Sequence, residues 1–115
     1  MKNLAKILFP FIFLGLFNCE VYKDTQLKKV GGESLRLTKV ENFDELRVHN
    51  DSTNISKYFR DYAKEKIKDG IVDEYGVFDE KTFKEVEHIG GRKKPNSLIP
   101  KTVQKEWEKY RSNFQ

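Results

Sequence analysis

The residue best placed to undergo a chemical modification is Cys19, the only cysteine of the chain. It stands just after an almost uninterrupted apolar run, Ile7–Phe17, which follows Lys2 and Lys6. A short positive segment followed by an apolar one is typical of an export leader. The run is too short, and too interrupted by Pro10, to cross the roughly 30 Å of a bilayer core as a helix. We therefore expect residues 1–18 to be a leader that ends next to a modifiable thiol.

The sequence Leu16-Phe17-Asn18-Cys19 resembles the lipobox of bacterial lipoproteins, with leucine at the third position before the cysteine. The resemblance covers only the leader. It implies that residues 1–18 are a signal peptide and that Cys19 carries acyl chains such as palmitate. The mature protein would then be lipid-anchored in the cell envelope of a bacterium, facing the periplasm or the exterior. The alternatives are a secretory signal cut elsewhere, a buried apolar helix of a cytosolic protein, and a misassigned gene start.

A second group of reactive residues lies in the stretch Val86–Gly91, which is followed by Lys94–Pro100 and an expected helix. This stretch resembles the ββα-metal finger of HNH endonucleases. The resemblance implies that Glu87 is an acidic metal ligand, that His88 is the base that activates water, and that Asn96 orients this base. A divalent metal would stabilise charge on the phosphate of a nucleic acid while a neutral imidazole takes a proton from water.

The helix of that family supplies a further histidine, but this chain has Gln104 at the corresponding place and Glu106 nearby. Glutamine is a weak neutral oxygen ligand, so a metal site would have to recruit Glu106 or remain empty. A purely structural interpretation stays open beside it. In that interpretation Gly90-Gly91 is a loop, Arg92-Lys93-Lys94 is a solvated basic patch, His88 is an ordinary polar residue, and no cofactor is bound.

Two further sets of residues are expected to be structural. His49 falls on the outward face of an expected strand without a second ligand near it in sequence, so we expect it at the surface. An aromatic set has the spacing of helical core positions and is expected to be buried. Its members are Tyr58, Phe59, Tyr62, Trp107 and Tyr110.

The composition sets bounds on size and partners. Removal of residues 1–18 leaves 97 residues, enough for one small domain. The leader holds two lysines and no acidic residue, so the formal net charge falls from +4 to +2. Such a small excess gives no support for a strongly basic nucleic-acid-binding stripe. With Cys19 lipidated, no thiol remains for a disulfide, and packing alone must stabilise the domain.

The elements that would position these residues begin with a hairpin. Leu35 and Leu37 alternate with polar residues, and the same alternation recurs at Leu46 and Val48. Period-two alternation predicts a β-hairpin with one buried face. The polar segment 19–33 before it is expected to be a lipidated tether, with a docked strand or short helix as the alternative.

Helices are expected after this hairpin. The turn and cap formers at 50–54 precede an apolar stripe that predicts a helix over 55–67. Residues 71–78 are expected to form a strand or an anchored loop, and a helix is favoured over 79–89. Val103, Trp107 and Tyr110 follow one another at steps of four and three, which predicts a final amphipathic helix.

The sequence thus predicts a small single α+β domain, residues 34–115, with a β-hairpin and two or three helices. Because no complete catalytic set is visible, the expected function is non-enzymatic: a membrane-anchored envelope lipoprotein that binds or supports an unidentified envelope or host protein. The alternative function is an HNH-like metal-dependent nuclease domain, intact or degenerate. Only this alternative implies a metal cofactor and a nucleic-acid partner.

Overall fold

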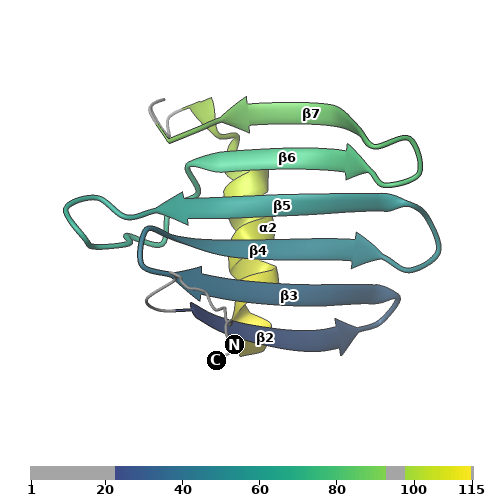
Figure 1. Cartoon of the computed structure of the whole chain (residues 1–115), viewed down its shortest axis with the longest axis horizontal. Helices are drawn as coiled ribbons and strands as arrows, with labels where there is room; N and C mark the ends of the chain where they lie inside the picture. Colours follow the sequence, from purple (N-terminus) through teal and green to yellow (C-terminus); the bar gives the residue numbers. More distant parts are fainter. Residues whose placement is uncertain (1–22, 93–97, 115) are drawn as a thin grey trace, which may run out of the picture.

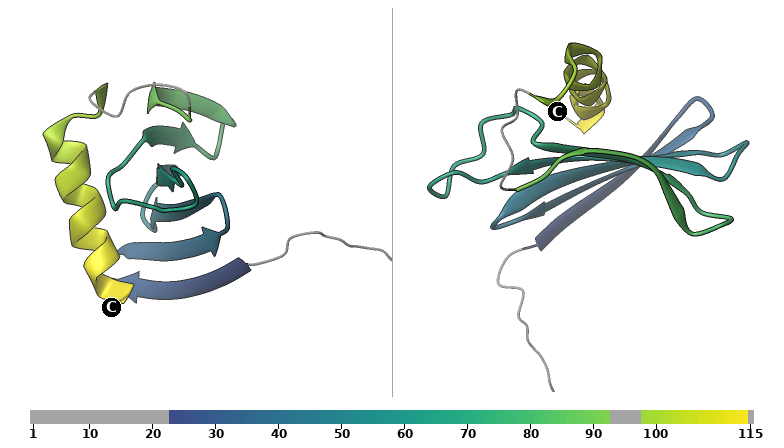
Figure 2. Two further views of the ribbon diagram at one scale, coloured as in Figure 1. Left: turned by 90° about the vertical axis from the view of Figure 1, so that its left-hand side faces the viewer. Right: turned by 90° about the horizontal axis from the view of Figure 1, so that it is seen from above.

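The computed structural model describes residues 23–92 and 98–114. These residues form one antiparallel sheet in which each strand pairs with the next along the chain, and one α-helix crosses a single face of that sheet (Figure 1, Figure 2). No helix within this part of the chain is both long and apolar enough to span a membrane. The elements are β2 (Lys23–Val30), β3 (Glu33–Val40), β4 (Phe43–Asn50), β5 (Ile55–Tyr62), β6 (Glu74–Asp79), β7 (Lys84–Gly90), α2 (Lys101–Arg111) and the 3-10 turn η2 (Ser112–Phe114).

The core lies between α2 and the inner face of the sheet. On the sheet side, Leu35 pairs with Val48 and Leu37 pairs with Leu46 across β3 and β4. This arrangement confirms the predicted hairpin with its buried face. The side chains buried in the core are Leu35, Leu37, Leu46, Val48, Phe59, Val72, Tyr75, Val103, Trp107 and Tyr110.

The predicted C-terminal helix is also confirmed. α2 buries Val103, Trp107 and Tyr110, the three residues whose spacing predicts one apolar face. It runs across the strands from the β7 side of the sheet to the β2 side (Figure 1). One helix therefore covers the inner face, and within residues 23–92 and 98–114 no other element covers the opposite face of the sheet (Figure 2).

The predicted fold class is wrong. The protein is mostly β, with one sheet and a single α-helix among the described residues, and not an α+β domain with two or three helices. The largest error is the helix predicted over 55–67, because Ile55–Tyr62 forms β5. Phe59 faces α2, whereas Tyr58 and Tyr62 lie on the opposite face of the same strand. Aromatic residues on both faces of a strand mimic a helical stripe, although aromatic residues also favour strands.

The helix favoured over 79–89 is wrong as well, because this segment forms a tight turn and β7. Oδ1 of Asp79 accepts the backbone amide of Lys81 at 2.9 Å and closes the turn. In the β6–β7 pairing Val77 faces Glu87 and the next residue, Phe78, faces Glu85, so the strands are offset by a bulge. A bulge breaks the period-two pattern and so hides the strand in the sequence.

The segment 19–33, expected to be a tether, contributes an edge strand instead. β2 pairs with β3 along its whole length, from Lys23 opposite Val40 to Val30 opposite Glu33. Of its side chains, Val30 packs against the core, while Leu27 is 76% exposed. An edge strand with few buried side chains gives little apolar periodicity, which explains why the sequence favours a tether here.

Candidate functional site

The uncovered face of the sheet carries the polar side chains of the central strands. We call this surface the open face. Because side chains alternate along a strand, residues paired across neighbouring strands fall in rows on one face. One row joins Arg36, Arg47 and Tyr58, and a second joins Glu45, Arg60 and Glu74. Both rows lie on the side of the sheet opposite α2.

A network of charged and hydroxyl groups holds the second row together. Arg60 donates from Nε to Glu45 at 2.8 Å and from a terminal nitrogen to Glu74 at 3.2 Å. The hydroxyl of Tyr62 and Nε2 of His88 each lie 2.6 Å from a carboxylate oxygen of Glu74. Glu45 and Glu74 are only 8% and 9% exposed. These carboxylates are therefore buried by their neighbours on the open face, which no other described element covers.

The charges in this network are balanced. Burial alone would raise the pKa of Glu45, but Arg60 and Arg47 lower that pKa overall. Burial would likewise raise the pKa of Glu74, but Tyr62, His88 and Arg60 lower it overall. Both carboxylates consequently stay ionised in the folded protein at neutral pH, and the network is a fixed part of the open face.

Tyr58 of the first row contacts an arginine from each row. The guanidinium carbons of Arg60 and Arg47 lie 4.8 Å and 5.7 Å from the centroid of the Tyr58 ring. Gly76 is its neighbour on β6, and a Cβ at that position would collide with the ring. Burial and the carboxylates of Glu74 and Glu85 raise the pKa of Tyr58 to about 12. Tyr58 is therefore a neutral aromatic side chain that packs over Gly76 on the open face.

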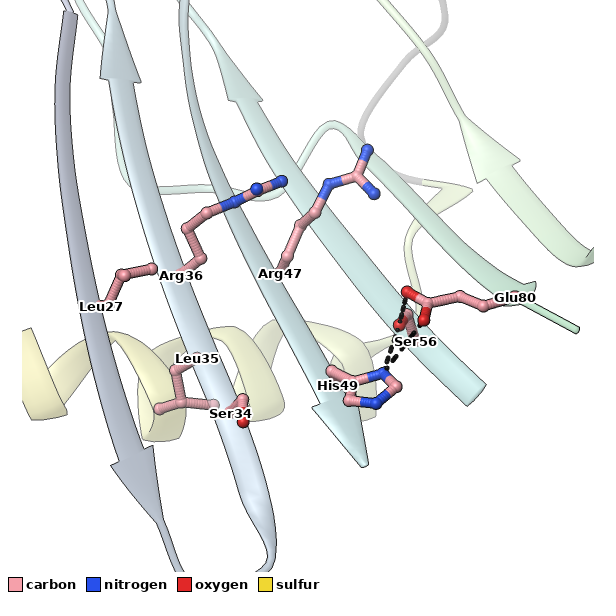
Figure 3. Close-up of a pocket in the computed structure, with 8 residues that line it drawn as sticks. All are labelled: Leu27, Ser34, Leu35, Arg36, Arg47, His49, Ser56 and Glu80. Atoms are coloured by element: carbon pink, nitrogen blue, oxygen red, sulfur yellow. Dashed lines mark hydrogen bonds and ion pairs between the residues drawn. The ribbon is translucent and has the colours of Figure 1, made fainter. Parts of the chain in front are cut away.

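A pocket of about 350 Å³ opens on the first row, on the side of β2 (Figure 3). Arg36 and Arg47 lie directly opposite each other on β3 and β4, and Figure 3 shows both side chains extending from the same side of the sheet. Arg47 contacts Glu45 at 3.1 Å. Within the described part of the chain, no carboxylate lies at ion-pair distance from Arg36. Arg36 thus contributes a guanidinium group without an ion-pair partner in that part of the chain, and Glu80 contributes a carboxylate to the same pocket. Other residues that line it include Leu27, Ser34, His49 and Ser56.

His49, Ser56 and Glu80 form a hydrogen-bonded cluster at one end of this pocket (Figure 3). Ser56 donates to Glu80 at 2.5 Å, and Nδ1 of His49 lies 3.0 Å from the Ser56 hydroxyl and 3.4 Å from Glu80. A hydrolytic triad needs the serine on one ring nitrogen and the carboxylate on the other. Here the serine and the carboxylate both lie near Nδ1 of His49, and the serine hydroxyl donates its proton to Glu80. The cluster is therefore suited to orienting His49, not to nucleophilic attack.

The residues singled out by the HNH resemblance are not brought together. His88 lies on the open face beside Glu74. On the other side of the sheet, Gln104 of α2 accepts the amide of Val72 at 2.8 Å, and Glu106 accepts Lys57 at 3.0 Å. Glu87 is exposed on the edge strand β7, and residues 98–99 form a short turn instead of a second strand.

Two predicted site residues, Cys19 and Asn96, lie outside the described residues, as do Lys93 and Lys94 of the basic patch. The support for the nuclease alternative is therefore the sequence resemblance, and not an arrangement of the described residues. His49 lies on the outward face of its strand, as expected, with 36% of its side chain exposed at one end of the pocket. Of the aromatic set, Phe59, Trp107 and Tyr110 are buried in the core as predicted, whereas Tyr58 and Tyr62 lie on the open face.

Sequence reasoning missed the arginine pair, although a signal for it exists. The confirmed hairpin places Arg36 and Arg47 on its solvent side, between the same leucine and valine positions that define the buried side.

Comparison of the chain with protein-family models, with curated proteins and with solved structures finds no match.

Proposed function

We propose that this protein is a non-enzymatic, lipid-anchored protein of a bacterial cell envelope that binds a small oxyanion-bearing ligand in the open-face pocket. The observation that supports the binding proposal most strongly is the direct pairing of Arg36 with Arg47. Of these two arginines, only Arg47 has a carboxylate at ion-pair distance among the described residues, that of Glu45. Like charges directly opposite each other destabilise a sheet. A bound oxyanion removes this repulsion.

The chemistry of the pocket suits phosphate. A guanidinium group forms two parallel hydrogen bonds with phosphate or carboxylate oxygens, and two such groups meet here. The volume of about 350 Å³ is at the lower end of the range for small-molecule sites. Leu27 adds an apolar wall to the polar pocket. The ligand is therefore a small phosphate-bearing molecule, either soluble or the headgroup of an anionic phospholipid.

The anchor is proposed from the lipobox resemblance at Cys19. Residues 20–22 alone separate this cysteine from the start of β2 at Lys23. Even a fully extended chain spans at most about 14 Å over that interval. An acylated Cys19 would therefore hold the β2 edge of the sheet, and the pocket beside it, close to the membrane surface. This proximity makes the phospholipid headgroup a realistic source of the phosphate.

The binding proposal predicts a measurable loss when one guanidinium is removed. In isothermal titration of the full chain in a mild detergent with inorganic phosphate, Arg36→Ser and Arg47→Ser should weaken binding about tenfold. Lys105→Ser, on the exposed side of α2, is the matched control and should bind as the wild type does. Vesicle flotation with and without phosphatidylglycerol separates the lipid source from the soluble one. Equal affinity in Arg36→Ser and Lys105→Ser would rule out the pocket.

The anchor proposal predicts a diacylglyceryl-modified cysteine at the mature N-terminus. Mass spectrometry of the protein isolated from membranes should show this modification at Cys19, and globomycin should cause the unprocessed form to accumulate. The Cys19→Ser variant should incorporate no labelled palmitate. An unmodified Cys19 in the envelope fraction would contradict lipidation and would leave the binding proposal standing.

A further inference from the structure

A second cluster of charged residues lies outside the open-face pocket, where β5 ends and the loop 63–73 leads into β6. Asp61, Asp69 and Asp73 each offer a carboxylate oxygen, and these oxygens lie within 4.8 Å of one another. Asp61 is 1% exposed and Asp73 is 3% exposed. Two of the three carboxylates are therefore shielded from water. An ionised group in such surroundings needs a positive partner.

Backbone amides hold the three carboxylates in place. Asp61 accepts the amide of Gly70 at 2.7 Å, and Asp69 accepts that of Ile71 at 3.0 Å. Asp73 accepts the amide of Tyr62 at 2.8 Å, across the loop. The loop is also fixed to α2, because the side chain of Gln104 bonds the amide of Val72 and the carbonyl of Gly70. The backbone amides and the contact with α2 thus hold the cluster in place before any ligand binds.

The ammonium group of Lys64 marks a cation position inside the cluster. Its nitrogen lies 2.8 Å from Asp73, 3.2 Å from the carbonyl oxygen of Tyr62, 3.5 Å from Asp69 and 4.0 Å from Oδ1 of Asp61. Four oxygens therefore surround one point, and three of them belong to carboxylates. A single ammonium group balances one of these three charges.

Oδ1 of Asp61 is left unsatisfied in this arrangement. It is buried, and it has no hydrogen-bond partner among the described residues. Lys64 lies too far away to bond it. The orphaned oxygen lies 4.0 Å from the same ammonium nitrogen that the other donors surround.

We propose that Asp61, Asp69 and Asp73 bind a divalent cation, Ca²⁺ by preference, at the position that the Lys64 ammonium occupies. Carboxylate and carbonyl oxygens are the ligands of hard cations, and Ca²⁺ accepts irregular sets completed by water, whereas Mg²⁺ demands near-ideal octahedral geometry. The side chain of Lys64 is 49% exposed and is free to turn toward solvent when the ion enters. The site is separate from the pocket and does not depend on the proposed function.

The test is calcium binding by the full chain after treatment with EDTA. Titration calorimetry should give a dissociation constant of about 10⁻⁴ to 10⁻³ M, the range of sites with few charged ligands. The thermal midpoint should rise by about 6–11 °C at a tenfold excess of Ca²⁺ over that constant, and KCl of equal ionic strength should not reproduce the rise. Absence of saturable binding up to about 10 mM Ca²⁺ would overturn the proposal.

Variants with opposite expected effects make the test specific. Asp61→Asn keeps an acceptor for the Gly70 amide but loses the charge, and should weaken Ca²⁺ binding at least about tenfold. Lys64→Met removes the internal competitor and should strengthen binding by a similar factor. Asp51→Asn, an exposed aspartate paired with Lys29, is the control and should bind as the wild type does. If Asp61→Asn and Asp51→Asn bind alike, or if Lys64→Met weakens binding, the site is not a cation site.

Discussion

Replacing Trp107 by alanine is expected to lower the free energy of unfolding by about 3–5 kcal/mol. Trp107 is 3% exposed, and its ring lies 6.5 Å from that of Phe59, which is fully buried. The substitution would open a cavity at the centre of the contact between α2 and the sheet. Because the stability of a small domain is itself about 5–15 kcal/mol, much of it would be lost.

Urea unfolding followed by circular dichroism measures this effect without the tryptophan signal. Lys105→Ala, on the exposed side of the same helix, is the control and should stay within about 0.5 kcal/mol of the wild type. A loss below about 1 kcal/mol for Trp107→Ala would contradict the packing of α2 on the inner face.

Replacing Arg60 by methionine is expected to destabilise the protein by about 2–4 kcal/mol at pH 7. Arg60 contacts both Glu45 and Glu74, whose side chains are only 10% and 11% exposed. Methionine fills part of the same space but leaves two buried carboxylates without their shared cation. The cost should be largely recovered in a triple variant that also carries Glu45→Gln and Glu74→Gln, because the charges are then removed together.

The same network predicts the direction of the pH dependence. The pKa values of Glu45 and Glu74 are lowered in the folded protein from 4.5. Their stabilisation is therefore present above pH 4.5 and is lost as the pH falls through the lower folded values. The stability difference between wild type and Arg60→Met should be largest near neutral pH and should shrink below about pH 4. A difference that is constant from pH 3 to pH 7 would show that packing, not charge, causes it.

The parts of the fold that sequence reasoning finds are those with a single buried face. Leu35, Leu37, Leu46 and Val48 alternate cleanly because the opposite face of that hairpin is polar, and α2 has one apolar stripe because it touches the sheet on one side only. The same approach fails for β5, because Tyr58 and Tyr62 lie on the open face while Phe59 lies in the core.

The apolar pattern of the sequence does not reveal the edge strands, and the reason is different. β2 buries little beyond Val30, and the bulge opposite Val77 and Phe78 interrupts the alternation of β7. Neither strand is specified by its own apolar pattern, since both form by pairing with a neighbour. Strand pairing is a tertiary interaction that a single-segment pattern does not reveal.

The two candidate sites differ in the same way. Arg36 and Arg47 could be placed together from the sequence, because they belong to one confirmed hairpin. The aspartate cluster could not, because Asp69 reaches Asp61 only through the path of the loop 63–73 and its contact with Gln104. A site made by loop geometry becomes visible only once the fold is known.

The most direct test of the binding account is to locate the phosphate. Titration of the ¹⁵N-labelled full chain in detergent micelles with inorganic phosphate, followed by amide chemical shifts, reports where the anion binds. The account predicts saturable shifts at Arg36, Arg47 and His49, and their loss in Arg36→Ser. Shifts confined to α2, or shifts that persist unchanged in Arg36→Ser, would contradict it.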